Sequence, residues 1–210
     1  LIPFAVRPAP GTSGAAVAVV LPTFTYMAYA NFLYDPADAD WMTGGAAVYD
    51  DVDAYIWSHP ELGFSMYNAH TDGSGIAYGS RLRPMLDIRP DHGFWLSRGG
   101  GWALSSDMYL IDWLEASGIS YDLLTDDDVH AEGAALLGRY RAVLTGAHPE
   151  YTTVQMLDAY EHYAQHGGRI MYLGGNGFYW VTTVLPDRPH VIEIRRGHAG
   201  TRTWESAPGE

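Results

Sequence analysis

Residues that could perform acid-base chemistry stand together in the segment His148-Pro149-Glu150. An imidazole can take up and release a proton near neutral pH, and a carboxylate can bind a cation or act as a base. The tripeptide alone is a weak signal, because His59-Pro60-Glu61 repeats it within irregular chain. The second copy follows an apolar run, so we predict that it lies at the carboxyl edge of a sheet.

A second polar segment, Gly174-Gly175-Asn176-Gly177, also follows an apolar run. A strand, a glycine-lined turn and a following helix form the layout of a nucleophile elbow, but here Asn176 occupies the position of the attacking residue. An asparagine cannot attack, although it can donate a hydrogen bond to an oxyanion. Two simpler interpretations stay open: Asn176 tolerates a positive φ in a tight turn, and Glu150 stabilises a helix start.

Further polar groups lie in the first half of the chain. Tyr26, Tyr29 and Asn31 follow the first apolar run, and Tyr67 precedes the segment His70-Thr71-Asp72-Gly73. That segment is typical of a turn or of a metal-binding loop, and Asp-Gly is first of all a turn signal. Tyr67 is unremarkable on its chemistry alone. The sequence has no HExxH, CxxC or G-x-S-x-G motif and no glycine-rich phosphate loop with a lysine, so the common zinc, serine-hydrolase and nucleotide motifs are absent.

The elements that must position these groups alternate between strands and helices. Strands are predicted over residues 16–21, 119–124, 142–144, 169–173 and 190–194. Helices are predicted over residues 106–117 and 131–137, and from a Thr152/Gln155 capping box to Gly167-Gly168. This alternation predicts an α/β fold with a doubly wound, mostly parallel sheet covered by helices on both faces. The polar segments would then collect along one edge of that sheet.

Residues 23–104 show no sustained hydrophobic period and contain clustered glycines and prolines. An irregular stretch of this length is typical of a functional loop region. We therefore predict one α/β domain over residues 1–210, with 23–104 as a long active-site region inside it. Because the sequence begins with Leu1 and shows no leader-peptide pattern, we expect it to be part of a longer polypeptide.

The composition excludes several classes of partner. The chain has 25 acidic and 12 basic residues, and the resulting formal charge of -13 would repel nucleic acids and anionic membranes. It has no cysteine, which removes disulfides, thiolate metal sites and a cysteine nucleophile. A cytoplasmic protein is expected on this basis. No apolar run approaches the 18 residues or so that a membrane-spanning helix needs.

Five segments, in this order and spacing, resemble the carboxy-terminal region of the large (beta) subunit of N,N-dimethylformamidase and its relatives: PTFTYMAYAN, YNAHTDGSG, LTDDDVH, TGAHPEY and GGRIMYLGGNGFYW. The resemblance runs from about Val20 to Ile194. It implies a flavodoxin-like or class I glutamine amidotransferase-like fold. It also implies an iron-dependent amide hydrolase that cleaves small N-substituted formamides, with dimethylformamide giving dimethylamine and formate, and a small partner subunit in a hetero-oligomer.

The resemblance further implies a mononuclear Fe(III) held by Tyr26, Tyr67 and Glu150. Tyr29 competes with Tyr26 for this role, because both lie in the same motif. Phenolates and carboxylates are hard anionic oxygen donors, which suit a small trivalent cation. This donor set weighs against an iron oxygenase, which typically presents two histidines and one carboxylate to Fe(II).

Two catalytic roles follow from the same resemblance. His148 is expected to transfer protons, and Asn176 to contact the substrate or the oxyanion of the transition state; other substrate-binding residues stay unassigned. Two alternatives remain at this point. The domain could be a non-catalytic, amidotransferase-like binding or scaffold module, or it could be another metal-dependent hydrolase.

Overall fold

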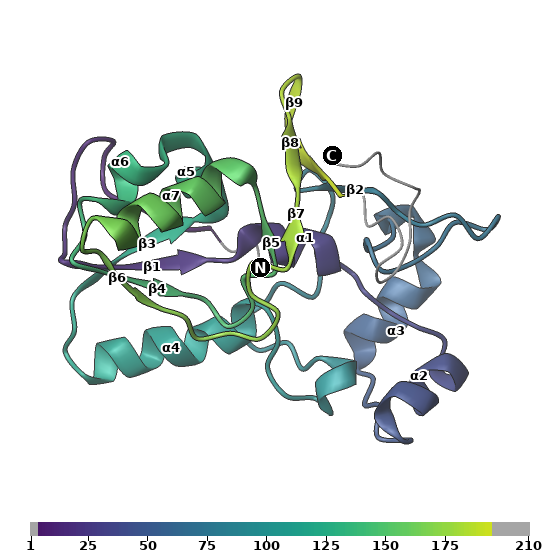
Figure 1. The fold of residues 1–210 in the computed structure, drawn as a ribbon. Coiled ribbons are helices and arrows are strands. Elements are labelled where there is room, and N and C mark those ends of the chain that lie inside the picture. The colour runs from purple at the N-terminus through teal and green to yellow at the C-terminus, as the bar shows by residue number, and fades with distance from the viewer. Residues whose placement is uncertain (1–3, 195–210) are drawn as a thin grey trace. The chain divides into compact units, whose positions relative to one another are not determined.

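A computed structural model describes residues 4–194 of the chain (Figure 1). The chain divides into two compact units. Unit 1 comprises Leu1–Thr25 and Ser106–Val181, and unit 2 comprises Tyr26–Ser105 and Thr182–Glu210. Each unit is therefore described by itself.

The centre of unit 1 is a four-stranded parallel sheet with the strand order β3-β1-β4-β6. Its strands are β1 (Val17–Leu21), β3 (Tyr121–Thr125), β4 (Ala142–Thr145) and β6 (Arg169–Met171). β1 is rich in β-branched residues and is almost wholly buried, as expected for a central parallel strand. Numbered among themselves in chain order, the four strands run 2-1-3-4. The flavodoxin-like or class I glutamine amidotransferase-like fold stays a prediction.

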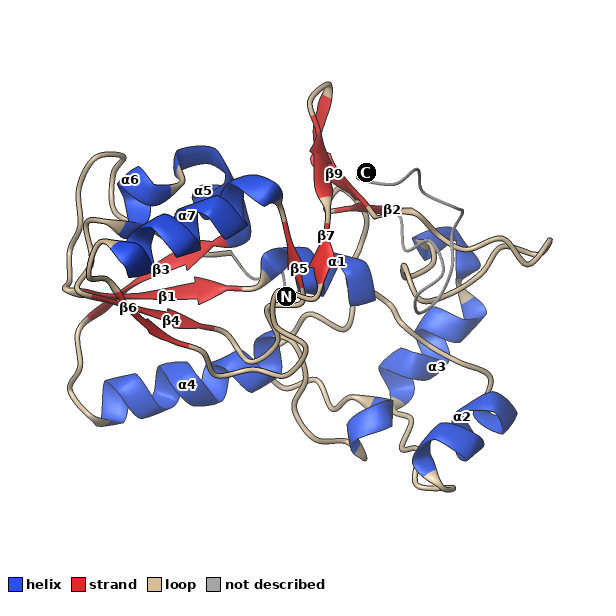
Figure 2. Cartoon of the chain, viewed as in Figure 1, coloured by secondary structure: helices blue, strands red, loops and turns tan. Residues whose placement is uncertain are grey.

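Helices cover both faces of this sheet (Figure 2). Helix α4 (Leu104–Ala116) lies on one face, and α5 (Asp126–Glu132), α6 (Ala134–Leu137) and α7 (Val154–Gln165) lie on the other. The single helix predicted over 131–137 is wrong, because a capping box at Thr125 and Asp128 starts α5 earlier and Gly133, with φ 58°, separates α5 from α6.

The start of α7 also differs from the prediction by one residue. The Thr153 hydroxyl caps the helix by accepting a hydrogen bond from the backbone N–H of Met156 at 3.3 Å, whereas Thr152 belongs to strand β5 (Tyr151–Thr152). Thr152 is already extended and paired, so it is Thr153 that turns the chain into the helix.

The nucleophile-elbow layout is not formed after β6. Between the glycine segment and Ile194 the chain forms no helix; instead β7 (Trp180–Val181) pairs in parallel with β5. Asn176 and Phe178 turn the chain with φ values of 50° and 56°. The residues after the turn are aromatic or β-branched, which favours a strand.

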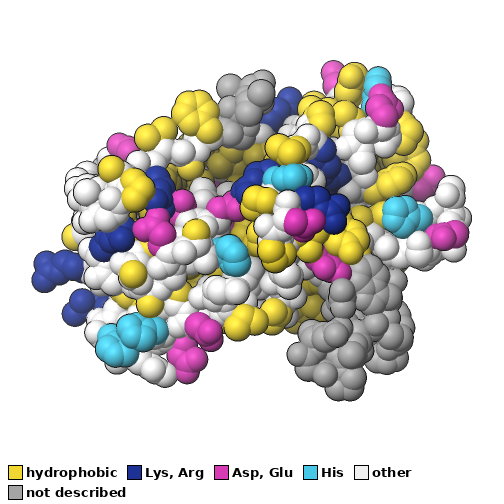
Figure 3. All heavy atoms as spheres, turned by 90° about the horizontal axis from the view of Figure 1, so that it is seen from above, with side chains coloured by type: hydrophobic (Ala, Val, Ile, Leu, Met, Phe, Trp, Pro, Cys, Tyr) yellow, Lys and Arg dark blue, Asp and Glu magenta, His cyan; other side chains and the backbone are white. Residues whose placement is uncertain are grey.

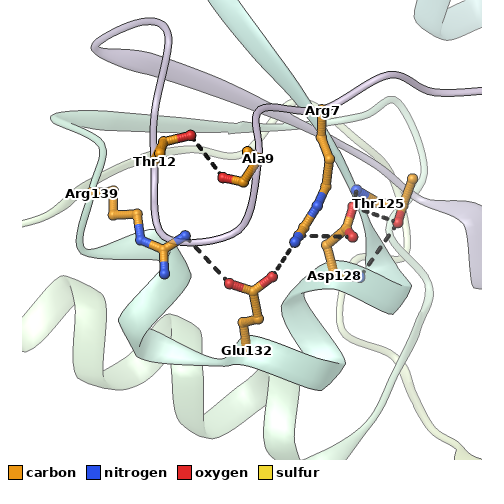
Figure 4. Close-up of polar contacts among 7 residues, drawn as sticks. All are labelled: Arg7, Ala9, Thr12, Thr125, Asp128, Glu132 and Arg139. Atoms are coloured by element: carbon orange, nitrogen blue, oxygen red, sulfur yellow. Dashed lines mark hydrogen bonds and ion pairs between the residues drawn. The ribbon is translucent and has the colours of Figure 1, made fainter.

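A cluster of ion pairs joins the amino-terminal segment to α5 (Figure 4). Arg7 lies 2.9 Å from the Asp128 carboxylate and also binds Glu132, which in turn lies 3.3 Å from Arg139. The hydrogen bond from Arg7 lowers the pKa of Glu132. These contacts hold the segment before β1 against α5.

Unit 2 has short elements joined by long connections. Its helices include most of α1 (Thr23–Tyr29), α2 (Pro36–Thr43) and α3 (Asp51–Ser58), with single turns of 3-10 helix at η1 (Pro60–Leu62) and η2 (Trp95–Ser97). Its antiparallel sheet has the order β2-β9-β8, from β2 (Tyr78–Ser80), β8 (Thr183–Leu185) and β9 (Arg188–Glu193). The region predicted to be irregular thus contains three helices that the hydrophobic pattern did not indicate.

The core of unit 2 is largely aromatic. Trp95 is fully buried, donates from its indole N–H to the carbonyl of Phe32 at 2.8 Å, and stacks on Tyr49 with ring centroids 5.7 Å apart. Around it are Phe32, Leu33, Ala39, Ile56 and Phe94. Burial of such rings is the main source of stability available to a region with so few strand residues.

The exposed face shown in Figure 3 mixes hydrophobic, acidic, basic and histidine side chains. Within residues 4–194, no helix has the length and apolar character needed to cross a membrane.

Candidate functional site

Two of the polar segments lie side by side in unit 1. The backbone N–H of Phe178 donates to the carbonyl of Pro149 at 2.8 Å, and those of Tyr179 and Trp180 donate to the carbonyl of Glu150 at 3.1 and 2.9 Å. Segments 149–152 and 178–181 are therefore locked together after the ends of β4 and β6. The prediction that polar groups collect at the carboxyl edge of the sheet is confirmed for these two segments.

Gly174, two residues before Asn176, makes this close approach possible. A side chain at Gly174 would place its Cβ 2.3 Å from the carbonyl oxygen of Ala147, and one at Gly175 would lie 3.8 Å from the imidazole of His148. A contact of 2.3 Å with backbone cannot be relieved by a rotamer change. Gly174 is thus required for the contact between the two segments rather than for its own turn conformation.

The carboxylate of Glu150 is buried and held on both oxygens. Its side chain is only 3% exposed, Oε2 lies 3.0 Å from Nε2 of His148, and Oε1 accepts a hydrogen bond from the indole N–H of Trp180 at 3.1 Å. The helix-start interpretation of Glu150 is wrong, because α7 begins at Val154 and is capped by Thr153. The carboxylate instead forms a fixed pair with an imidazole.

Two side chains that the sequence analysis did not single out hold the backbone of this segment. The hydroxyl of Thr25 accepts from the N–H of Glu150 at 3.0 Å, and the buried carboxylate of Asp107 accepts from the N–H of Ala147 at 2.5 Å. Trp180 was also missed. Thr25 lies in the segment PTFTYMAYAN and Trp180 in GGRIMYLGGNGFYW, two of the segments that carry the family resemblance. Their position in these segments was the signal that could have indicated a role in the site.

A buried histidine-glutamate pair is suited to proton transfer. A buried carboxylate is costly unless it is paired or hydrogen-bonded, and the two contacts on Glu150 meet that requirement. The carboxylate in turn orients the imidazole, which is the arrangement that a general acid-base residue needs. His148 is 13% exposed and can therefore exchange protons with a bound molecule or water.

Asn176 lies on the surface of unit 1 in a left-handed conformation, with φ 50°. The following N–H, of Gly177, donates to the hydroxyl of Tyr172 at 2.8 Å. The interpretation that Asn176 tolerates a positive φ in a tight turn is confirmed. Its role toward an oxyanion stays a prediction.

In unit 2 the predicted ligand Tyr67 is held by specific contacts. Its ring stacks on Tyr29 with centroids 4.2 Å apart, and its N–H donates to the hydroxyl of Ser65 at 3.0 Å. The neighbouring Asn68 donates to the carbonyl of Leu33 at 2.8 Å. Tyr26 is buried in α1, and the choice between Tyr26 and Tyr29 as a ligand stays open.

The segment His70-Thr71-Asp72-Gly73 is a turn. The N–H of Gly73 donates to the carbonyl of His70 at 2.9 Å, and the Asp72 carboxylate accepts from the N–H and hydroxyl of Ser74 at 2.9 and 2.7 Å. The turn interpretation is therefore confirmed, and the local contacts of Asp72 lower its pKa.

The predicted iron ligands are divided between the units: Tyr26 and Tyr67 belong to unit 2, and Glu150 belongs to unit 1. In the described part of the chain no three His, Cys, Asp or Glu side chains are grouped to hold a metal, so a metal there would need another donor type, such as tyrosine. The buried, oriented carboxylate of Glu150 and the two phenols have the hard oxygen chemistry that suits Fe(III). The donor types of the three residues therefore suit a ferric ion, and their assignment as ligands stays a prediction.

Unit 1 thus combines a parallel α/β sheet with a buried histidine-glutamate pair and a glycine-lined turn beyond the carboxyl ends of its strands. Residues 1–210 match the family described as N,N-dimethylformamidase beta subunit-like, C-terminal. The whole chain is 42% identical to part of the N,N-dimethylformamidase beta subunits of an Alcaligenes species and of Paracoccus aminophilus, and it covers 27% of the length of each. The chain belongs to this family, as the five motifs predicted.

Proposed function

We propose that the chain is the carboxy-terminal part of an amide hydrolase that acts on small N-substituted formamides, with N,N-dimethylformamide as the reference substrate. The observation that carries the proposal is the 3.0 Å pair between the imidazole of His148 and the buried carboxylate of Glu150. Membership of the family supports the choice of substrate. The relatives are named beta subunits, which supports a multi-subunit assembly, and we propose that the partner is a smaller subunit.

Tyr26, Tyr67 and Glu150 would hold the ferric ion in this proposal. When bound, the ion would supply a Lewis acid that polarises an amide carbonyl or lowers the pKa of water. The contacts of the Glu150 carboxylate with His148 and Trp180 fix its orientation. Trp180 is therefore a positioning residue for the glutamate.

His148 moves the proton that the reaction must transfer. Water attacks the carbonyl carbon, a C–O bond forms, and the imidazole of His148 accepts the proton that water loses. The C–N bond then breaks, and the same proton passes to the amine nitrogen, which leaves as dimethylamine. The other product is formic acid, which releases its remaining proton to solvent and becomes formate. The side-chain amide of Asn176 donates a hydrogen bond to the oxygen that gains negative charge.

Replacement of His148 tests the proton-transfer role. In the full-length enzyme with its partner subunit, we expect His148→Ala to reduce formate release by about 10²- to 10⁴-fold, the usual contribution of a general acid-base residue. Iron content should not change. His162→Ala, at an exposed position in α7, is the matched control and should retain full turnover. Full turnover in His148→Ala would overturn the proposed role.

The metal is tested separately from the proton transfer. Two phenolate ligands on Fe(III) give a visible charge-transfer band, so Tyr67→Phe should shift or abolish that band. Tyr109→Phe, at a site that is 68% exposed, should leave it unchanged. A colourless wild-type protein without iron and without amidase activity would favour the alternative of a non-catalytic binding module.

A further inference from the structure

Unit 2 contains a cavity of about 480 Å³ that no predicted role accounts for. Its apolar wall is formed by Leu33, Tyr34, Ile56, Trp57, Phe64 and Tyr67. Its volume lies within the range of about 300–1,000 Å³ that is usual for small-molecule sites. One of its lining residues, Tyr67, is also a proposed iron ligand.

Most polar side chains of the cavity are occupied by contacts within unit 2. Asn31 donates to the carbonyl of Pro84 at 2.8 Å and accepts from the N–H of Leu86 at 2.9 Å. Asn68 donates to the carbonyl of Leu33 at 2.8 Å and accepts from the hydroxyl of Ser65 at 2.8 Å. These amides shape the wall and have little capacity left for a ligand.

The charge of the lining does not favour an anion. It includes the carboxylate of Asp35 and no lysine or arginine. His59 also lines the cavity, and its Nδ1 lies 2.8 Å from the carbonyl of Tyr55, which leaves Nε2 as the ring nitrogen that could meet a ligand. A mainly aromatic wall with a few polar groups suits a small uncharged molecule with an apolar body.

Two rings that line the cavity are partly exposed to solvent. Trp57 is 55% exposed and Phe64 is 46% exposed, although both line the cavity. Rings in this position offer apolar contact to a molecule that arrives from water. A second cavity, in unit 1, is more polar, and its Glu115 and Tyr121 bond to each other at 2.8 Å. The unit 1 cavity therefore lacks the apolar, aromatic wall of the unit 2 cavity.

We propose that the unit 2 cavity binds the small, uncharged N-alkyl amide substrate and presents it beside Tyr67. The choice of ligand rests on the proposed function, whereas the existence of an apolar binding site does not. The cavity determines affinity and size selectivity. The chemical step stays with the residues described above.

Removal of part of the wall tests affinity. In the full-length enzyme, we expect Trp57→Ala to raise the KM for N,N-dimethylformamide roughly fivefold, the effect of losing one aromatic contact. The kcat and the iron content should stay at the wild-type level. Trp41→Ala is the matched control, because Trp41 is a helical tryptophan of unit 2 that is 79% exposed and does not line the cavity. Equal KM values in the two variants would overturn the proposal.

Filling the cavity tests size selectivity. Ala69 is exposed and lines the cavity, so Ala69→Phe should reduce kcat/KM more for N,N-diethylformamide than for N,N-dimethylformamide. Ala54→Phe, at an exposed position of α3, adds the same ring away from the cavity and should leave the ratio unchanged. An unchanged ratio in Ala69→Phe would contradict the proposal.

A binding measurement separates this inference from the proposed function. Saturation-transfer NMR with N,N-dimethylformamide should detect binding to the wild type and to Trp41→Ala, and weaker binding to Trp57→Ala, whether or not turnover occurs. Binding that depends on Trp57 in a protein without iron or activity would support the cavity and reject the hydrolase. Equal binding to all three proteins, or binding of dimethylammonium in place of the amide, would reject the cavity assignment.

Discussion

The two units position their functional side chains in different ways. Unit 1 places His148 and Glu150 at the ends of a regular parallel sheet, where the backbone pairing of segments 149–152 and 178–181 fixes them. Unit 2 places Tyr67 in an irregular segment, where single side chains replace the hydrogen-bond ladder. A regular scaffold fixes a site through many equivalent bonds, whereas an irregular one depends on a few specific residues.

Arg83 illustrates this dependence in unit 2. Its guanidinium donates to the carbonyls of Phe64 at 2.5 Å and of Ala30 at 3.2 Å. One side chain thereby links the residue that follows α1 to the segment that precedes Tyr67. In unit 1 the corresponding connections are turns of a few residues between strands and helices, as is usual for α/β folds.

The largest expected effect follows from breaking the aromatic core of unit 2. Trp95→Ala removes a fully buried ring and its hydrogen bond to Phe32, and should cost about 3–5 kcal/mol of stability. Hydrogen exchange should increase throughout residues 26–105. Trp41→Ala, at an exposed site, should change stability by no more than about 0.5 kcal/mol.

In Trp95→Ala, hydrogen-exchange rates of residues 106–181 that stay near the wild-type values would show that the ring stabilises unit 2 alone. An equal increase in both ranges would show that the units unfold together. The idea that an irregular region relies on a few residues would then need revision, because the same ring would also be stabilising the parallel sheet.

The buried carboxyl group of Asp87 makes the stability of unit 2 depend on pH. Burial raises the pKa of Asp87 to about 6, against the opposing effects of a hydrogen bond from the N–H of Asn31 and the charge of Arg83. The folded state therefore favours the protonated acid. Stability that is fully present below about pH 4 should be lost as the pH rises from about 4 to about 6, by about 3 kcal/mol.

Asp87→Asn should remove this loss, because the amide does not titrate. The difference in unfolding free energy between the variant and the wild type, measured with urea, should shift in favour of the variant between pH 4 and pH 6. Asp112→Asn, at an exposed site of α4, should show a constant difference. A constant difference in Asp87→Asn as well would contradict the assigned pKa.

The same contrast explains how much could be predicted from the sequence. The parallel strands of unit 1 were predicted because runs such as 16–21 are apolar and bounded by turn residues. The position of His148 and Glu150 followed from the rule that sites lie at the carboxyl ends of such strands. Local bounds were less predictable: Thr153 rather than Thr152 caps α7, because the pairing of β5 decides which threonine is free to cap.

Unit 2 could not be predicted in the same way. Its helices α2 and α3 have eight residues each, too few for a clear hydrophobic period, and its core is built from contacts between distant residues such as Phe32 and Trp95. Tyr67 carries no local signal of its function; only the resemblance indicated it. The partners of Glu150 show the same limit, since the contact with Trp180 joins residues thirty positions apart.

The smallest expected effect concerns a single cap in the regular unit. Thr153→Ala removes the hydroxyl that accepts from the N–H of Met156 and lies 2.9 Å from Nδ1 of His130. Loss of an N-cap costs about 1 kcal/mol, and Thr153→Ser should recover most of it in urea unfolding because the hydroxyl is restored. The sheet pairing of β5 should keep Glu150 in place, so turnover should change little. A large loss of turnover in Thr153→Ala would show that the site in unit 1 also depends on one side chain, and the contrast with unit 2 would then fail.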